Sequence, residues 1–208
     1  GEIYTIDKVA PTVTMSTTAP EPTNTSPVPV TVTFSETVTG FTATDISASN
    51  ATTNAFSGSG GSYSFNLTPT GQGVVTASIA AKVAVDAAGN SNTAAMQFRR
   101  TYDSVAPIIT ILGTNPVYLA KNDQYTDAGA TATDNLDGVI TEKIVATGLP
   151  IDTMIPGTYS VRYNVTDKAG NSAEEKTRTV RVADKSLPTL YNTGLSNLRV
   201  VLPGDAID

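Results

Sequence analysis

The sequence has no cysteine and no histidine among its 208 residues. Zinc sites built from cysteine and histidine ligands are therefore excluded, as are nucleophilic sites of the Cys-His and Ser-His-Asp types. Because no disulfide can form, the fold must be stabilised by packing rather than by crosslinks. The chain also lacks tryptophan, and only 6% of its residues are aromatic, so few flat side chains are present to stack against a ligand.

Charged residues are also few. They make up 15% of the chain, and the formal net charge at pH 7 is −6. Nucleic-acid binding requires clustered lysine and arginine, so this balance argues against a nucleic-acid partner and is compatible with bound cations. No run approaches the roughly 18 apolar residues of a membrane-spanning helix, which predicts no membrane insertion. The opening stretch GEIYTID lacks the basic start and apolar core of a signal peptide, and we expect the chain to be a piece of a longer protein.

Apolar and polar residues alternate with a period of two in several segments. In VPVTVTF (28–34) the valines and the phenylalanine fall on one face, and GTYSVRYNVTD (157–167) repeats the pattern with tyrosine and valine. Such alternation is typical of strands that are half-buried in an antiparallel sheet. The Ala-rich stretch 75–89 is the one candidate for a short helix. Many short strands separated by turn sequences predict an all-β fold of the sandwich type.

A proline-bearing phrase occurs three times, as DKVAP, DSVAP and DKSLP, beginning at residues 7, 103 and 184. The intervals of 96 and 81 residues are ordinary lengths for a small β-sandwich. We interpret each phrase as a lead-in segment to a new domain and expect two tandem sandwiches in an elongated arrangement. The predicted parts are the end of an upstream domain or linker, two domains, and a linker or truncated third domain, at residues 1–6, 7–102, 103–183 and 184–208.

A polar turn is also repeated, as VDAAGN (85–90) and TDKAGN (166–171). In both copies an aspartate stands three residues before a Gly-Asn pair. Asp86 is followed 17 residues later by Asp103, and Asp167 is followed 17 residues later by Asp184. The turn and the lead-in segment thus repeat as one unit, which predicts that the two parts act together.

Two sets of phrases are shared with known families. On APTVTMS, PTNTSPVPVTVTFSETVTGFTATDI, FSGSGGSYSFNLTPTGQG and VAVDAAGNSNTAA, residues 7–102 resemble the bacterial Ig-like repeats found in tandem in large surface and adhesin proteins. On APIITILG, YTDAGATATDNLDGVIT, PGTYSVRYNVTDKAGN and RTVRV, residues 104–183 resemble a second bacterial Ig-like type, common at cell surfaces and on secreted enzymes. The resemblance implies two immunoglobulin-like β-sandwiches and a location outside the cell.

In an Ig-like order of strands, the second turn, the lead-in Asp103 and the loop at 132–139 lie at the same end of the sandwich. Crowded carboxylates repel one another, and a hard cation removes that cost. Calcium prefers six to eight oxygen ligands from carboxylates, amides and backbone carbonyls. We therefore predict calcium sites at the module junctions. The predicted ligands are Asp103, Asp134, Asn135, Asp137, Asp167 and Asn171 in the second copy, and Asp7, Glu36, Asp86 and Asn90 in the first.

An alternative interpretation of the repeated turn needs no metal. Aspartate caps its own turn through its side chain, glycine takes a positive φ, and asparagine tolerates one, so D-x-x-G-N is also ordinary turn chemistry. The spacing in DNLDG is not that of an EF-hand loop. Both interpretations stay open at the level of the sequence.

The function that we expect is that of a non-catalytic, extracellular structural or spacer module of a bacterial surface or adhesin protein, whose partners are neighbouring Ig-like domains. Catalysis is not expected, because the acidic residues lie in turns and linkers and no nucleophile motif is present. The alternatives are an accessory carbohydrate-binding module of a secreted polysaccharide-degrading enzyme and a subunit of a surface filament or layer. For sugar binding the free aromatic side chains would be Tyr102, Tyr118, Tyr125 and Tyr191.

Overall fold

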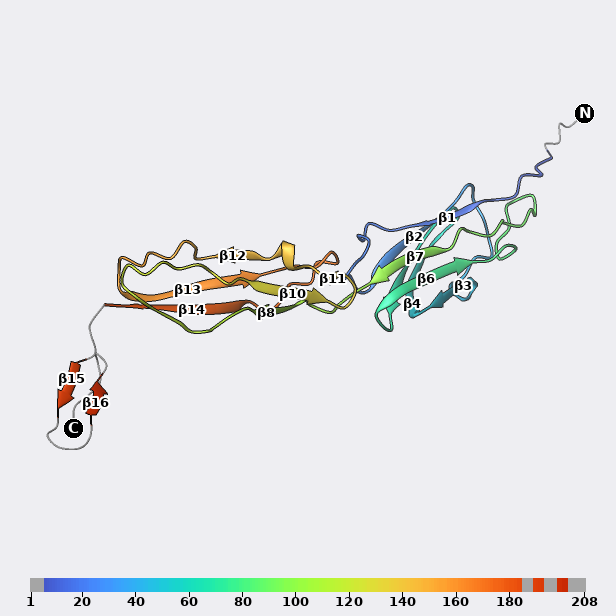
Figure 1. The fold of residues 1–208 in the computed structure, drawn as a ribbon. Coiled ribbons are helices and arrows are strands. Elements are labelled where there is room, and N and C mark those ends of the chain that lie inside the picture. The colour runs from blue at the N-terminus through green and yellow to red at the C-terminus, as the bar shows by residue number, and fades with distance from the viewer. Residues whose placement is uncertain (1–5, 185–188, 193–197, 202–208) are drawn as a thin grey trace, which may run out of the picture. The chain divides into compact units, whose positions relative to one another are not determined.

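The computed structural model describes residues 6–184, 189–192 and 198–201, and within these it is all-β, with two 3-10 turns and no α-helix. Nothing in these ranges forms a helix with the length and apolar character needed to cross a membrane. The chain divides into two compact units. The first comprises residues 1–107, 133–139 and 166–173, and the second comprises 108–132, 140–165 and the segment that starts at residue 174. The strands are labelled in Figure 1.

The first unit contains two facing sheets. The four-stranded sheet has the antiparallel order β1-β2-β5-β4, and the three-stranded sheet has the order β3-β6-β7. The strands of the first sheet are β1 (Val13–Ser16), β2 (Val28–Phe34), β5 (Ser62–Pro69) and β4 (Ala51–Ser59). Those of the second are β3 (Ile46–Ser49), β6 (Gly73–Ile79) and β7 (Phe98–Tyr102).

The core of the first unit lies between these sheets and follows the predicted alternation. In β2 the side chains of Val28, Val30, Val32 and Phe34 are all buried, and the residues between them are exposed. The Ala-rich stretch that was the candidate for a short helix begins inside β6 instead. Val75, Ala77 and Ile79 are at most 1% exposed, so burial with a period of two prevails over the helix propensity of alanine.

The second Ig-like region also contains two sheets. One has the order β11-β10-β8 and the other the order β12-β13-β14-β9. The strands of the first are β11 (Gly138–Val139), β10 (Ala130–Asp134) and β8 (Ile108–Ile111). Those of the second are β12 (Val145–Thr147), β13 (Gly157–Asn164), β14 (Lys176–Ala183) and β9 (Val117–Ala120). All described pairs in the second sheet are antiparallel except β14 with β9, which is parallel.

A short antiparallel pair follows, formed by β15 (Thr189–Asn192) and β16 (Leu198–Val201). Most of the remaining residues of the predicted C-terminal segment, and residues 1–5 of the predicted N-terminal segment, lie outside the described residues. The predictions for these segments therefore stay predictions.

Candidate metal centres

The two copies of the D-x-x-G-N turn adopt the same structure. The Oδ1 atom of Asp167 accepts hydrogen bonds from the backbone N–H groups of Gly170 and Asn171, at 2.7 and 2.8 Å. The Oδ1 atom of Asp86 accepts from Ala88 and Asn90, both at 2.8 Å. The glycines have φ angles of +87° and +96°, a conformation that side chains with a Cβ rarely adopt. The turn chemistry expected from the sequence is therefore present in both copies.

The asparagine that ends each turn ties it to the lead-in segment. Asn171 donates from Nδ2 to Oδ2 of Asp167 at 2.8 Å and to the backbone carbonyl of Asp103 at 3.0 Å. Asn90 donates in the same way to Asp86 at 2.8 Å and to the carbonyl of Asp7 at 3.3 Å. This contact explains why the turn and the lead-in phrase repeat together in the sequence. The asparagine side chain fixes the lead-in aspartate next to the turn.

The lead-in aspartates are also held alike. The Oδ1 atom of Asp103 accepts from the backbone N–H of Val105 at 3.0 Å, and that of Asp7 accepts from Val9 at 2.9 Å. The two environments differ in burial, because Asp103 is 1% exposed and Asp7 is exposed. A further hydrogen bond reaches the second copy from Asn24, which donates to Oδ1 of Asn171 at 3.3 Å.

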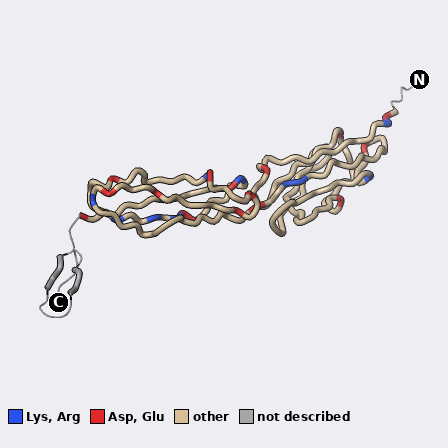
Figure 2. Tube along the Cα trace, in the orientation of Figure 1, with Lys and Arg blue, Asp and Glu red and all other residues tan. Residues whose placement is uncertain are grey.

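These contacts bring carboxylates together in two groups, both inside the first unit. The first cluster consists of Asp7, Glu36 and Asp86, and the second cluster of Asp103, Asp134 and Asp167. In each cluster one carboxylate oxygen per residue lies within 4.8 Å of the others. Acidic residues are otherwise spread thinly along the chain (Figure 2). The sequence therefore identified six residues that the fold places in two compact groups.

One oxygen of the second cluster is buried without a partner. The Oδ1 atom of Asp134 accepts from the backbone N–H groups of Leu136 and Asp137, at 2.9 and 2.8 Å. Its Oδ2 atom is buried and has no hydrogen-bond partner among the residues that the structure describes. An unsatisfied buried carboxylate oxygen is costly, so this atom is the feature of the cluster that most requires a ligand.

The remaining predicted ligands have different surroundings. Asn135 is exposed on the same loop. Asp137 accepts from the backbone N–H of Lys168 at 2.8 Å and forms an ion pair with the Lys168 ammonium at 3.3 Å. Both copies of the D-x-x-G-N turn are alike except that Lys168 replaces Ala87, and this difference was the available signal for the ion pair. In this arrangement the amides of Asn90 and Asn171 donate to aspartate oxygens and position the clusters.

The pKa values of the clusters respond to crowding. Burial raises the pKa of Asp103; the Val105 hydrogen bond lowers it, and the charges of Asp134, Asp167 and Asp137 raise it. The pKa of Glu36 is raised by desolvation and by Asp86 and Asp7. The Asn90 side chain, by contrast, holds the pKa of Asp86 below its usual value. Two groups are thus held ionised at a cost at neutral pH, which a bound cation would remove.

The residues of both clusters fit calcium. Calcium–oxygen distances of roughly 2.4 Å place two ligand oxygens at most about 4.8 Å apart across one ion. The oxygens of each cluster lie within 4.8 Å of one another, all of them are hard donors, and the unpartnered atom of Asp134 is free to act as a ligand. Backbone carbonyls and water would complete the six to eight ligands that calcium requires.

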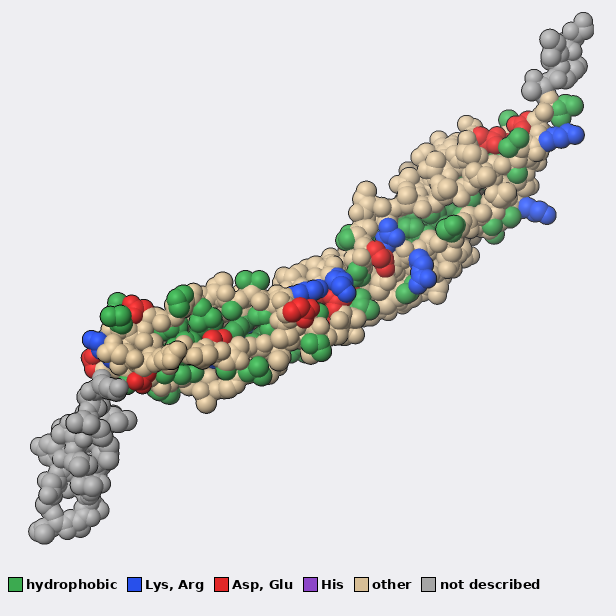
Figure 3. Space-filling view, turned by 45° about the horizontal axis from the view of Figure 1, so that its top comes forward, with side chains coloured by type: hydrophobic (Ala, Val, Ile, Leu, Met, Phe, Trp, Pro, Cys, Tyr) green, Lys and Arg blue, Asp and Glu red, His purple; other side chains and the backbone are tan. Residues whose placement is uncertain are grey.

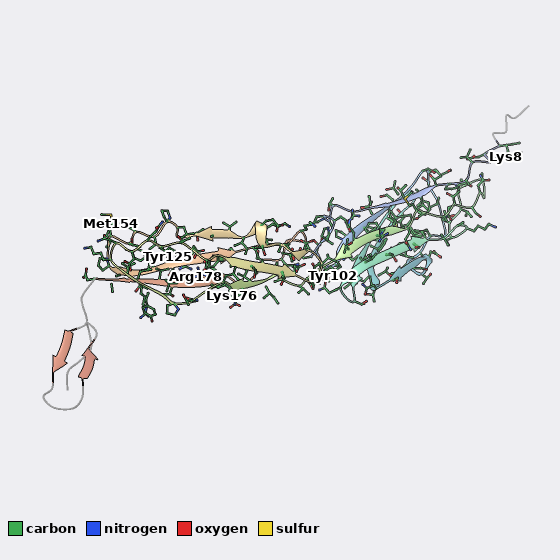
Figure 4. All side chains as sticks on the ribbon, in the orientation of Figure 1. Lys8, Tyr102, Tyr125, Met154, Lys176 and Arg178 are labelled. Carbon is green, nitrogen blue, oxygen red and sulfur yellow. The ribbon has the colours of Figure 1, made fainter. Side chains whose placement is uncertain are left out.

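The second unit has a buried polar network of its own, around Arg178. This side chain is 1% exposed, and its Nη1 atom lies 2.5 Å from Oδ1 of Asp127. The hydroxyl groups of Tyr125 and Tyr163 donate to Asp127 at 2.6 and 2.8 Å. Burial raises the pKa of Asp127, but the tyrosine hydrogen bonds and the Arg178 charge outweigh it and hold the pKa below its usual value. Tyr125 and Arg178 are labelled among the strands in Figure 4.

The tyrosines predicted to be free for sugar stacking are not grouped by any described contact. Tyr118 is 69% exposed, with the Arg181 guanidinium 5.8 Å from its ring centroid. Tyr102 is half-buried, Tyr125 belongs to the Arg178 network, and the side chain of Tyr191 lies outside the described residues. The face shown in Figure 3 carries dispersed hydrophobic and charged side chains on a mainly polar surface.

The paired sheets in both sequence halves define immunoglobulin-like sandwiches. Residues 7–102 match the family described as bacterial Ig-like domain, and residues 109–182 match the family described as bacterial surface protein, Ig-like domain. The chain therefore contains two bacterial Ig-like domains, which confirms the predicted fold class and family. Only Ig-like families match, which indicates a non-catalytic module, and the surface-protein family suggests the cell surface.

Several solved structures are similar to parts of the chain. The lipoprotein BT2262 from Bacteroides thetaiotaomicron is 28% identical over 39% of this chain and 39% of that one, with a TM-score of 0.35. A structure of CBM51-2 in complex with GlcNAc and INT domains from Clostridium perfringens ZmpB is 32% identical over 38% of this chain, with a TM-score of 0.31. The chain spans 17% of the length of that structure. No curated protein matches the sequence significantly.

Proposed function

We propose that the chain is a non-catalytic, extracellular structural module of a bacterial surface or adhesin protein. Its domains extend over residues 7–102 and 103–183, and calcium bound by the two acidic clusters stiffens the joints between tandem domains. The two matched families support the structural role, and the surface-protein family supports the location. The clusters support the calcium component.

The observation that carries the calcium proposal is the buried, unpartnered Oδ2 atom of Asp134. It belongs to the same group of carboxylates as the buried Asp103 and Asp167. Hydrogen bonds alone account for the turn, but they leave this oxygen unsatisfied and three negative charges close together. A cation between the three carboxylates satisfies the oxygen and neutralises the charges.

The mechanical consequence follows from where these residues stand in the chain. Asp103 belongs to the lead-in segment, and Asp134 and Asp167 belong to two loops of the sequence matched to the second family. An ion bound to all three would hold the lead-in segment to both loops. The segment itself carries proline and valine rather than flexible glycine and serine, which also favours a stiff connection.

Thermal unfolding with calcium and with a chelator tests this proposal. Calcium that binds only the folded state at 100 times its Kd stabilises by about 2.7 kcal/mol, which raises the Tm of a chain of this size by about 5–10 °C. The substitutions Asp103→Asn and Asp167→Asn are expected to reduce this increase. The measurement is differential scanning calorimetry at millimolar calcium.

Asp152→Asn is a matched control, because Asp152 is an exposed aspartate whose Oδ1 atom also accepts a backbone hydrogen bond, from Met154 at 2.9 Å. This variant is expected to keep the full response to calcium. A calcium-dependent change in Tm near zero for the unmodified chain would remove the metal and leave only the spacer role.

A further inference from the structure

The two D-x-x-G-N turns differ at one position, and the residue there changes the charge of the second cluster. Lys168 occupies the place of Ala87, and it contacts both carboxylate oxygens of Asp137. The backbone N–H donates to Oδ2 at 2.8 Å, and the ammonium lies 3.3 Å from Oδ1. The Asp137 side chain is 5% exposed, whereas that of Lys168 is 63% exposed. The carboxylate is therefore built into the loop, and the ammonium covers it from the solvent side.

Asp137 acts on the second cluster through its charge. It contributes to raising the pKa of Asp103, together with Asp134 and Asp167. The second cluster thus has four interacting carboxylates, and the first cluster has three: Asp7, Glu36 and Asp86. The positive charge of Lys168 offsets the fourth carboxylate and leaves both clusters with a similar net charge.

We propose that Lys168 is a built-in counter-ion that sets the calcium affinity of the second cluster. It stabilises the metal-free state by neutralising Asp137, and it weakens calcium binding by repelling the incoming ion. The inference rests on the proposed calcium function, and it assigns Asp137 to Lys168 rather than to the metal. Lys168 therefore tunes the affinity of the site without contacting the ion.

The direct test is Lys168→Ala, studied by calcium titration calorimetry in the full chain. Alanine is compatible with this turn, because Ala87 occupies the same position in the first copy, and the backbone hydrogen bond to Asp137 does not need the lysine side chain. One unit charge at several ångströms in a partly screened site changes an ion affinity by roughly three- to tenfold. We expect calcium affinity of the second cluster to rise by this factor, while the Tm in chelator falls by up to about 3 °C.

Three further variants separate charge from structure. Lys168→Arg keeps the charge, so its affinity is expected to stay within about twofold of the unmodified chain. Asp137→Asn removes one negative charge and is expected to weaken binding by a factor similar to the gain in Lys168→Ala. The double variant Asp137→Asn/Lys168→Ala restores the net charge, and its affinity is expected to return to that of the unmodified chain.

The outcomes distinguish this inference from the calcium proposal on which it rests. Calcium binding that is unchanged or weaker in Lys168→Ala overturns the counter-ion role and leaves the calcium site in place. A double variant that binds far more weakly than the unmodified chain identifies Asp137 as a direct ligand and overturns the inference. Absence of calcium binding in both the unmodified chain and Lys168→Ala overturns the calcium proposal itself.

Discussion

At the scale of single residues, Asp103 is a carboxylate that the fold buries although its environment opposes the charge. Burial and three neighbouring aspartates raise its pKa, so the folded state holds this proton more tightly than the unfolded chain does. Between the unfolded pKa of about 3.9 and the raised folded value, stability without metal must fall as the pH rises. The loss is complete above the raised value.

Asp103→Asn is expected to remove this loss. In chelator the variant should match the unmodified chain below about pH 4 and become progressively more stable than it as the pH rises, because the neutral amide carries no penalty. Each pKa unit of separation corresponds to about 1.4 kcal/mol. Urea unfolding at pH values from about 3 to about 8, a range that begins below the unfolded pKa, measures the difference. A constant difference across this range would contradict the assignment of the pH dependence to Asp103.

At the scale of elements, burial with a period of two explains which strands the sequence could predict. β2 and β13 alternate between buried and exposed side chains along most of their length. The two residues of β11 and the three of β12 are all exposed, so no pattern of hydrophobicity marks them. The pairing of β9 with β14 joins segments about 60 residues apart, and alternation within a strand does not specify such a partner.

The same limit applies to the sites. The strand order predicted that Asp103, Asp134 and Asp167 would share one end of the sandwich, since each is adjacent to a predicted strand or lead-in segment. The ion pair of Asp137 with Lys168 depends on the path of an irregular loop, which no periodic pattern encodes. Arg178, in contrast, was visible in the sequence, because it alternates with Val180 and Val182 in β14 and is buried with them.

The network of Arg178 makes β14 vulnerable to single changes. Arg178→Met removes the charge that Asp127 needs and leaves a buried carboxylate with only its tyrosine and backbone donors. Loss of one partner of a buried pair destabilises by about 3–5 kcal/mol, measured by urea unfolding of the second unit. Arg162→Met is the control on β13, because the pair of Arg162 with Glu175 is largely exposed and is expected to contribute about 0–1 kcal/mol. Equal losses in both variants would show that burial of the pair is unimportant.

At the scale of the whole molecule, the chemistry of the surface distinguishes the spacer role from its alternatives. Carbohydrate binding generally needs stacked aromatic rings, and of the four tyrosines predicted to be free, only Tyr118 is exposed within the described residues. We therefore expect less than about a tenth of the chain to be retained on insoluble polysaccharides such as chitin or cellulose, in line with the few aromatic contacts available.

The pull-down is made with and without calcium, and with Tyr118→Ala. Strong retention that the substitution abolishes would favour an accessory carbohydrate-binding module over a spacer. Concentration-dependent assembly of the full chain in sedimentation velocity would instead favour a subunit of a filament or surface layer. A monomer that is not retained agrees with the spacer role.

The parallel pairing of β9 with β14 determines how the second Ig-like region would respond to tension along the chain. Val117 to Ala120 are in register with Val180 to Ala183, one strand near the start of the region and the other at its end. When the two ends are pulled apart, parallel neighbours slide lengthwise past each other, so their hydrogen bonds are loaded in shear and must rupture together. Such a geometry resists extension far better than one that opens bond by bond, a property suited to a chain that transmits force.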